Sequence, residues 1–380
     1  MLLILIGALF CSFVVGVLLV RFRHLHDRFS SDHDLGGVQK FHAAPVPRIG
    51  GVPVMAGLGV GALILALLTG ESLSFGLLVS ALPAFAAGLI EDLTKKVGPL
   101  PRLLATFVAA GMGFWLLNAG LLRLDVPGVD QLLRYHWAIS LLFTMFAVGG
   151  VAHAINIIDG YNGLAGMVSV FIFMALAYVA FKVRDPQIMG LCFAATGAVL
   201  GFLVWNFPRG LLFAGDGGAY LIGFLIAELS VLMVARHTEV SPWFPLLLVI
   251  YPVFETVFSI YRRKFLQGRS VGYPDALHLH QMIYKRLVRW MVGSKEARHM
   301  TRRNSMTSPY LWALSSLSVA PAMLFWNNSP VLIGCVCLFV LAYLYLYRMI
   351  IRFRSPRWMV LYRPVARDKK AVALSYDSER

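Results

Sequence analysis

Residues 1–20, MLLILIGALFCSFVVGVLLV, form an unbroken apolar run. A helix rises about 1.5 Å per residue, so about twenty residues cross the hydrocarbon core of a bilayer. No basic residue precedes this run and no small-residue cleavage site follows it. We therefore expect a retained first helix rather than a cleaved signal peptide.

Apolar runs of similar length recur along almost the whole chain. Of its 380 residues, 58% are hydrophobic and 14% are charged. In soluble domains about a quarter of the residues are charged. The alternating pattern of a membrane barrel does not occur. We therefore predict an all-α fold, a polytopic integral membrane bundle of about 11 transmembrane helices. The expected spans are 1–20, 51–69, 74–90, 103–121, 136–156, 163–181, 188–205, 217–235, 243–261, 309–327 and 331–349.

The basic residues are distributed unequally between the two sides that these spans would create. With the N-terminus outside, nearly all of the 34 Lys and Arg residues fall in inside segments or at their edges. The exceptions are Arg123, Arg134, Lys182, Arg184 and Arg236. Because cytoplasmic loops are rich in Lys and Arg, we expect the N-terminus outside and the C-terminus in the cytoplasm. This distribution also explains the net charge of +15 without binding to nucleic acid.

The chain is expected to contain one membrane domain, residues 1–350, with a long basic cytoplasmic loop at 262–308. A polar cytoplasmic tail follows over residues 351–380. The four cysteines all lie within apolar runs and have neither metal-ligand nor redox spacing. We interpret them as small buried hydrophobic residues.

Three polar stretches with carboxylates lie at span ends on the predicted cytoplasmic face. They are LIEDLTKK with Glu91 and Asp92, NIIDGYNGLAG with Asn156, Asp159 and Asn162, and NFPRGLLFAGDGGAYLIGF with Asp216. Each has an ordinary structural explanation: the start of a loop, a turn between helices, or a helix cap. Each could also bind a cation, and the glycines would let a phosphate approach the backbone.

Two basic stretches lie on the same face. They are YPDALHLHQMIYKRL with His278 and His280, and QKFHAAPVPRIGGVPVMAG with Lys40, His42 and Arg48. Loop histidines usually bind nothing, and cytoplasmic basic residues are common in membrane proteins. The same side chains are also those that hold phosphate oxygens.

The five stretches together indicate a shared site for a cation and phosphate groups, which no single stretch does. Mg²⁺ is commonly bound by one or two carboxylates, water and substrate phosphates, while Lys, Arg and His bind the remaining phosphate oxygens. We therefore predict a Mg²⁺-dependent phosphoryl or phosphosugar transfer at the membrane face. A nucleotide-linked donor would come from the cytoplasm and a lipid acceptor from the bilayer.

These motifs, in this order, resemble the polyprenyl-phosphate N-acetylhexosamine-1-phosphate transferase family over about residues 1–290. This family includes the bacterial enzymes that start O-antigen and wall teichoic acid, and the translocase of peptidoglycan synthesis. The resemblance implies a multi-pass protein of the bacterial inner (plasma) membrane with a cytoplasmic active site. Family members transfer a sugar 1-phosphate from a UDP-sugar to undecaprenyl phosphate with Mg²⁺, for which Mn²⁺ could substitute, and release UMP.

The resemblance also implies catalytic and metal-binding residues. Asp216 matches the aspartate that binds Mg²⁺, and Asp92 matches the second acid of the paired-aspartate motif. Asp92 and Asp159 are expected near the metal and the acceptor phosphate, one of them as general base or to orient the attacking oxygen. Glu91 stands where the first acid is usually aspartate. The predicted catalytic residues are therefore Asp92, Asp159 and Glu91, and the predicted metal ligands are Asp216 and Asp92.

The predicted substrate-binding residues follow from the same motifs. Asn156 matches the leading amide of the Asn-x-x-Asp-Gly motif, and Asn162 stands where some members have a second aspartate. Gln281 replaces the third residue of the histidine motif. The full predicted set is Asn156, Asn162, His278, His280, Lys40, His42 and Arg48.

Several alternatives remain open at this point. The sequence KFHAAPVPRIGG before the second span resembles the hexosamine transferases, which favours UDP-GlcNAc or a related N-acetylated amino sugar and the initiation of O-antigen or another envelope polysaccharide. Phospho-MurNAc-pentapeptide transfer is the alternative within the family. Glu228 and Glu255 within spans could belong to a membrane transporter, but transporters place their sites near the midplane and contain inverted repeats. A homodimer is also open.

Overall fold

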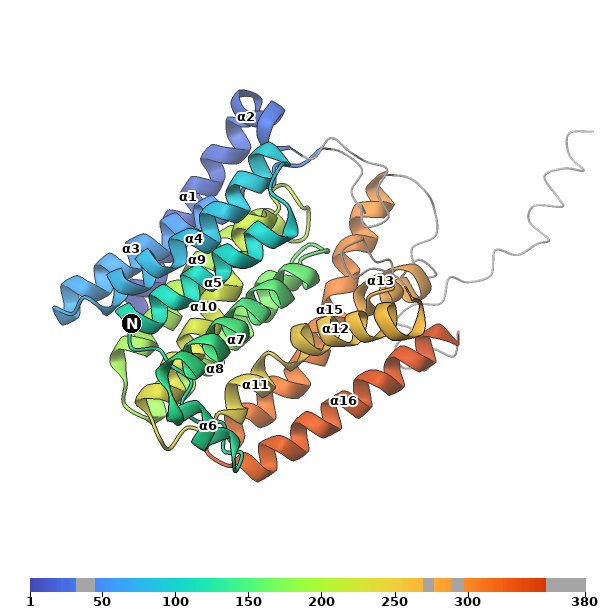
Figure 1. Ribbon diagram of the computed structural model, residues 1–380. Coiled ribbons are helices and arrows are strands. Elements are labelled where there is room, and N and C mark those ends of the chain that lie inside the picture. Colours follow the sequence, from blue (N-terminus) through green and yellow to red (C-terminus); the bar gives the residue numbers. More distant parts are fainter. Residues whose placement is uncertain (32–44, 269–276, 289–296, 353–380) are drawn as a thin grey trace, which may run out of the picture.

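The computed structural model describes residues 1–31, 45–268, 277–288 and 297–352. Within these ranges the chain is helical, and an isolated bridge between Ser31 and Pro47 is the only β pairing (Figure 1). The elements are α1 (Leu2–Arg21), α2 (Arg23–Ser30), α3 (Gly51–Thr69), α4 (Leu73–Thr94), α5 (Pro99–Leu116), α6 (Val129–Tyr135), α7 (Trp137–Ile158), α8 (Leu164–Lys182), α9 (Pro186–Asn206), α10 (Gly215–Arg236), α11 (Trp243–Leu248), α12 (Ile250–Tyr261), the π-helical η1 (Arg262–Leu266), α13 (Leu279–Ile283), the π-helical η2 (Tyr284–Val288), α15 (Ala297–Leu324) and α16 (Ser329–Ile351).

The structure confirms a polytopic helical membrane bundle. Among the described residues, nine helices are long and apolar enough to cross a membrane. They are α1, α3, α4, α5, α7, α8, α9, α10 and α16, and each corresponds to one of the eleven expected spans. The remaining two expected spans, 243–261 and 309–327, are built differently.

The expected span at 243–261 is divided into two helices at Val249. Pro252 has no N–H to donate to the carbonyl of Leu248, and its ring would clash with that carbonyl in a continuous helix. In the observed structure Pro252 lies in the first turn of α12, where its missing N–H costs nothing. The proline therefore explains why α11 ends and a new helix begins.

The expected span at 309–327 is the second half of a longer helix. Helix α15 begins at Ala297, so the expected cytoplasmic loop at 262–308 contains several helical segments. The polar residues Asn304, Ser305, Thr307 and Ser308 near the start of α15 are buried, which shows that this half packs against protein. The helix therefore contributes buried polar groups at one end of the bundle and an apolar surface further along.

Helix α10 forms the axis of the bundle. Its apolar stretch is 94% buried, against 17–44% for α1, α3, α4, α5, α7 and α16. It packs against α3, α4, α5, α7, α8 and α9, and Figure 1 shows it in the interior of the bundle. Residues in the first turn of α10 are therefore positioned by several helices at once.

Two glycines of α3 give a direct test of this packing. A methyl group on Gly57 would lie 2.5 Å from the backbone oxygen of Ala8 in α1, whereas one on Gly59 would meet no atom within 4 Å. We expect Gly57→Ala to lower the free energy of unfolding by about 1–3 kcal/mol, because α1 and α3 would have to separate. The control Gly59→Ala should change it by less than about 0.5 kcal/mol. Thermal unfolding in detergent measures both, and equal midpoints would contradict the close contact.

Candidate active site

The candidate site is centred on the N-terminus of α10. Asp216 is the second residue of this helix and follows Gly215, whose φ of 70° directs the chain into the first turn. The side chain of Asp216 is 11% exposed. The free N–H groups and the dipole of a helix N-terminus favour negative charge, so this end of α10 stabilises carboxylate and phosphate groups.

Asp92 fixes the start of α10 to α4. Its carboxylate is completely buried, with Oδ1 accepting the N–H of Asp216 at 2.9 Å and Oδ2 accepting the N–H of Gly217 at 2.8 Å. Gly88 permits the approach of the two helices, because a Cβ there would lie 2.5 Å from the carbonyl carbon of Asp216. Asp92 therefore acts as an N-terminal cap supplied by a different helix.

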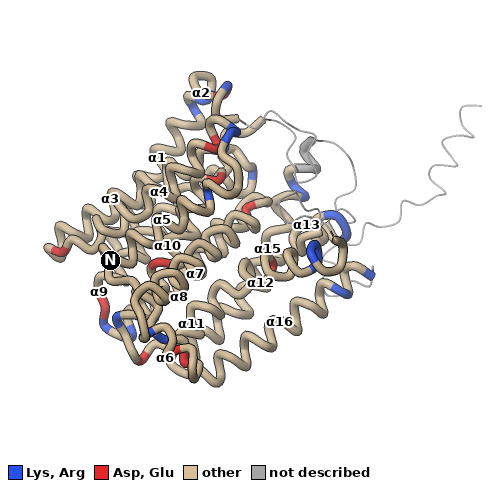
Figure 2. Tube along the Cα trace, viewed as in Figure 1, with Lys and Arg blue, Asp and Glu red and all other residues tan. Residues whose placement is uncertain are grey.

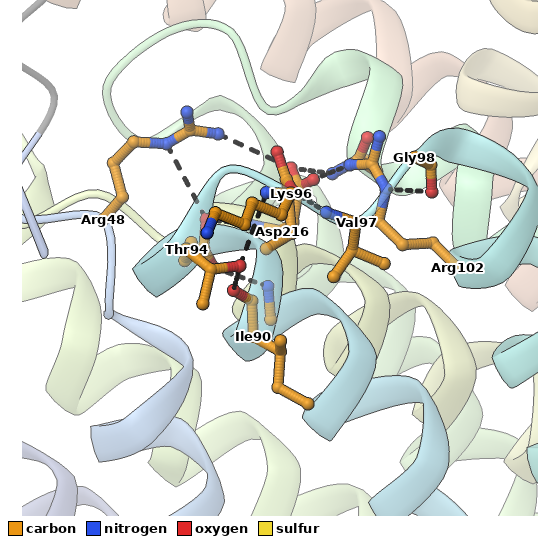
Figure 3. A network of polar contacts seen from close by, with 12 residues as sticks. Arg48, Ile90, Thr94, Lys96, Val97, Gly98, Arg102 and Asp216 are labelled. Atoms are coloured by element: carbon orange, nitrogen blue, oxygen red, sulfur yellow. Dashed lines mark hydrogen bonds and ion pairs between the residues drawn. The ribbon is translucent and has the colours of Figure 1, made fainter. Parts of the chain in front are cut away.

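Three side chains from distant parts of the sequence surround the carboxylate of Asp216. Arg102 of α5 forms an ion pair with Oδ2, and Nη2 of Arg48 lies 3.5 Å from Oδ1 (Figure 3). Nδ2 of Asn156, near the end of α7, donates to Oδ1 at 3.0 Å. The structure thus brings together Asp216, Asn156 and Arg48, as the sequence motifs predict, and adds Arg102.

Asp159 follows the last residue of α7. Burial raises the pKa of its carboxyl to about 8, Arg48 opposes this rise, and Asp92 adds to it. Asp159 therefore lies close enough to Arg48 and Asp92 to interact with their charges, and these two residues also surround Asp216. Its carboxyl therefore holds a proton near pH 7 when no cation is bound.

The carboxylates fit a magnesium site that a substrate completes. Among the described residues, no group of three or more His, Cys, Asp or Glu side chains could hold a metal by itself. Mg²⁺ needs no such group, because one or two carboxylates with phosphates and water are sufficient. Asp216 and Asp159 fit this pattern. Asp92 fits it less well, because its two oxygens are bound to backbone N–H groups.

Asn162 has a different environment from Asn156. Its N–H donates to Oδ1 of Asn304 at 2.7 Å, and its carbonyl accepts from the hydroxyl of Ser308 at 2.6 Å. Its own amide donates to the carbonyl of Pro208 at 3.1 Å. These bonds from α15 and from the residues after α9 hold the loop at 159–163, so the structure gives Asn162 a role in loop geometry. Its predicted contact with substrate stays a prediction.

Glu91 also bonds to backbone. Its Oε2 accepts the N–H of Val97 at 2.7 Å, which stabilises the turn between α4 and α5. Lys40 and His42 lie outside the described residues, and their predicted role stays a prediction.

The two histidines of the fourth motif lie together and next to the loop at 159–163. Their rings are stacked, with centroids 5.2 Å apart and planes at 10°. A Cβ on Gly160 would lie 3.6 Å from Nε2 of His280, and the ring of Tyr161 meets His280 edge-on at 5.5 Å. The histidine motif therefore packs against the loop that carries Asp159, in a buried position.

The sequence analysis did not select Arg102 or Glu255 as site residues. In the sequence, Arg102 resembles the other basic residues of a cytoplasmic loop. Only its position directly after Pro99-Leu100-Pro101 sets it apart. Glu255 is an acid in an apolar span, and His278 Nδ1 lies 2.9 Å from it. An intramembrane acid is a signal for function, but not for its partner.

Comparison with known proteins identifies the family. The family model for glycosyl transferase family 4 matches residues 74–234. A decaprenyl-phosphate N-acetylglucosaminephosphotransferase of Mycobacterium tuberculosis is 30% identical over 337 residues, which cover 78% of this chain and 77% of that protein. The chain belongs to glycosyl transferase family 4.

Other members of glycosyl transferase family 4 support the same assignment. A Bacillus subtilis protein named probable undecaprenyl-phosphate N-acetylglucosaminyl 1-phosphate transferase is 30% identical over 64% of this chain and 67% of its own length. A phospho-N-acetylmuramoyl-pentapeptide-transferase of Listeria monocytogenes is 30% identical over 62% of this chain and 74% of its own length. These relatives are phosphosugar transferases, which confirms the resemblance and favours an enzyme over a transporter.

The cap formed by Asp92 predicts a difference between the two neighbouring acids. In Asp92→Asn one of the two N–H groups of α10 would lose its acceptor, so we expect a loss of about 1–3 kcal/mol in the free energy of unfolding. Glu91→Gln keeps an oxygen for its single bond to Val97 and should lose less than about 0.5 kcal/mol. Thermal unfolding in detergent compares them. Similar midpoints for both variants would refute the capping role.

Proposed function

We propose that the chain transfers an N-acetylated amino-sugar 1-phosphate from a UDP-sugar to undecaprenyl phosphate and releases UMP. The observation that carries this proposal is the cluster at the start of α10, where Arg48, Arg102 and Asn156 surround Asp216. In the reaction an oxygen of the acceptor phosphate attacks the phosphorus that bears the sugar. The bond from that phosphorus to the oxygen of UMP breaks, and a lipid diphosphate sugar forms.

The residues of the cluster have complementary roles in this proposal. Asp216 would hold Mg²⁺, which when bound offsets the charge of the donor diphosphate. Arg48 and Arg102 would then bind phosphate oxygens instead of the Asp216 carboxylate. Asp159 is the better candidate for the acid near the metal that orients the attacking oxygen of the acceptor phosphate, because both oxygens of Asp92 are bound to backbone N–H groups.

The charge distribution supports a cytoplasmic site. Many Lys and Arg residues of the described chain lie at the end of the bundle that contains α2, α13 and the end of α16 (Figure 2). Asp216 pairs with Arg48, whose backbone N–H donates to the carbonyl of Ser30 at the end of α2, and cytoplasmic loops are the basic ones. We therefore place the N-terminus outside, the site in the cytoplasm, and the protein in the bacterial plasma membrane.

An apolar cavity supports a lipid acceptor. It has a volume of about 300 Å³ and lies between α7, α10, α11 and the residues at 121–126. Val151 of α7 lines it, and Asp159 follows eight residues later, about 12 Å along a helix. The cavity is also lined by Leu124, Pro242 and Trp243 at the opposite end of the spans, so the distal part of the isoprenoid chain would occupy it while the phosphate lies at the candidate site.

We prefer a GlcNAc-type donor to UDP-MurNAc-pentapeptide. Relatives named for the two activities are equally identical, at 30%, and cover 64–78% and 62% of this chain. The basic sequence before α3 favours the same donor. Initiation of O-antigen or another envelope polysaccharide is the pathway type that this donor and acceptor imply, and pentapeptide transfer remains the alternative.

The function is tested by transfer assays with undecaprenyl phosphate, Mg²⁺ and a panel of UDP-sugars. We expect Mg²⁺-dependent UMP release with UDP-GlcNAc or a related sugar, and none after chelation with EDTA. Asp216→Asn should lower the rate at least about 100-fold, because it removes charge from the proposed metal ligand. UMP release that persists in EDTA, or in folded Asp216→Asn, would refute the proposed role of Asp216.

The raised pKa of Asp159 predicts that cation binding depends on pH. Below pH 8 this carboxyl holds a proton that a cation must displace, so the affinity for Mg²⁺ should rise as the pH increases from about 6.5 to 8.5 and then level off. The rise of the unfolding temperature with Mg²⁺ concentration measures this affinity without requiring activity. Asp159→Asn should show a weaker pH dependence. A wild-type affinity that is constant over this range would contradict the prediction.

A further inference from the structure

Glu255 is a completely buried carboxylate in α12 with donors on both oxygens. Its Oε1 lies 2.9 Å from Nδ1 of His278 and accepts the N–H of Leu279 at 3.1 Å. Its Oε2 accepts the hydroxyl of Tyr343, in α16, at 2.8 Å. A carboxylate can only accept hydrogen bonds, so Nδ1 of His278 carries the hydrogen. Both oxygens of Glu255 therefore accept hydrogen bonds from other parts of the protein.

A second set of bonds holds the same segment from its other side. The carbonyl of Leu277 accepts from Nη1 of Arg262 at 2.8 Å and from the hydroxyl of Tyr347 at 3.1 Å. Arg262 also donates to the Tyr347 oxygen at 2.7 Å. Residues 277–279 are therefore fixed between the end of α12 and the last turns of α16.

This support reaches the candidate site through the two imidazoles. The ring of His278 stacks on that of His280, which lies beside Gly160 and Tyr161. A change at Glu255 would therefore act on the loop that carries Asp159 through the orientation of His278.

We propose that Glu255 and Tyr343 are positioning residues for the transfer reaction. The carboxylate fixes the ring of His278 and its Nδ1–H tautomer, and the Tyr343 hydroxyl fixes the carboxylate. The imidazole of His278 is thereby held in one orientation and one tautomer. This inference rests on the proposed function. It makes the C-terminal span α16 part of the active-site support as well as part of the bundle.

Two pairs of variants test the proposal. Glu255→Gln removes the charge at nearly constant volume, and Tyr343→Phe removes only the hydroxyl. The matched control for the first is Glu228→Gln, because Glu228 is equally buried in α10 and neither of its oxygens has a hydrogen-bond partner in the described part of the chain. The matched control for the second is Tyr345→Phe, because Tyr345 lies on α16 and is 60% exposed.

The readout is UMP release at varied concentrations of each substrate. We expect kcat to fall about 10–100-fold in Glu255→Gln and in the same direction, by a smaller factor, in Tyr343→Phe. KM for both substrates should stay within about twofold, because positioning acts on the reacting geometry. Both controls should keep kcat within about twofold of wild type.

A double variant separates positioning from general stability. In the His278→Ala background, adding Glu255→Gln should lower the rate by less than about twofold, because Glu255 acts through the missing imidazole. A purely structural role predicts the same factor in both backgrounds, and that result would overturn the proposal. A radiolabelled donor gives the sensitivity that these slow variants need.

The outcomes for the two proposals are distinct. Wild-type kcat in folded Glu255→Gln overturns the positioning role and leaves the proposed function intact. If Glu255→Gln does not fold, Tyr343→Phe decides, and an unchanged kcat there overturns the role. A wild-type chain that releases no UMP with any UDP-sugar overturns the proposed function itself.

Discussion

The bonds from both Asp92 oxygens to the first N–H groups of α10 are the interaction on which the candidate site depends. They join α4 to the most buried helix of the bundle at a point where Gly88 leaves no room for a larger residue. The helix N-terminus and Arg48, whose Nε lies 3.8 Å from Oδ1 of Asp92, both oppose the buried negative charge. Asp216 is thereby held between two arginines before any ligand binds, as preorganised electrostatic catalysis requires.

The polar groups around this point divide into those that bond to the Asp216 carboxylate and those that hold the backbone. Asn156 bonds to the Asp216 carboxylate, whereas Asn162, six residues later in the same motif, is bonded to α15 and to Pro208. Glu255 likewise bonds to the segment that carries the histidines. Fully satisfied buried polar bonds of this kind fix the geometry of the loops that carry the site residues.

Much of this architecture was predictable, and the exceptions have physical causes. Run length predicted eleven spans, and nine of them are continuous helices in the described part of the chain. The interruption at Val249 depends on the position of one proline relative to a carbonyl. The motifs predicted that Asp216 and Asn156 share a site. The site roles of Arg102 and Glu255 were not predicted, because their partners lie far away in the sequence. Local patterns of charge or hydropathy contain no information about such contacts.

The hydrogen bonds that Asn304 and Ser308 make to the backbone of Asn162 have a consequence for the biosynthesis of the protein. Asn304 and Ser308 follow Asn162 by 142 and 146 residues. At translation rates of about 5–20 residues per second, they leave the ribosome about 7–30 s after the loop that they hold. The nascent chain thus inserts most of its helices while this loop is still incomplete. Competence for chemistry is acquired late in biosynthesis, when a helix from the C-terminal part of the chain docks against the earlier ones.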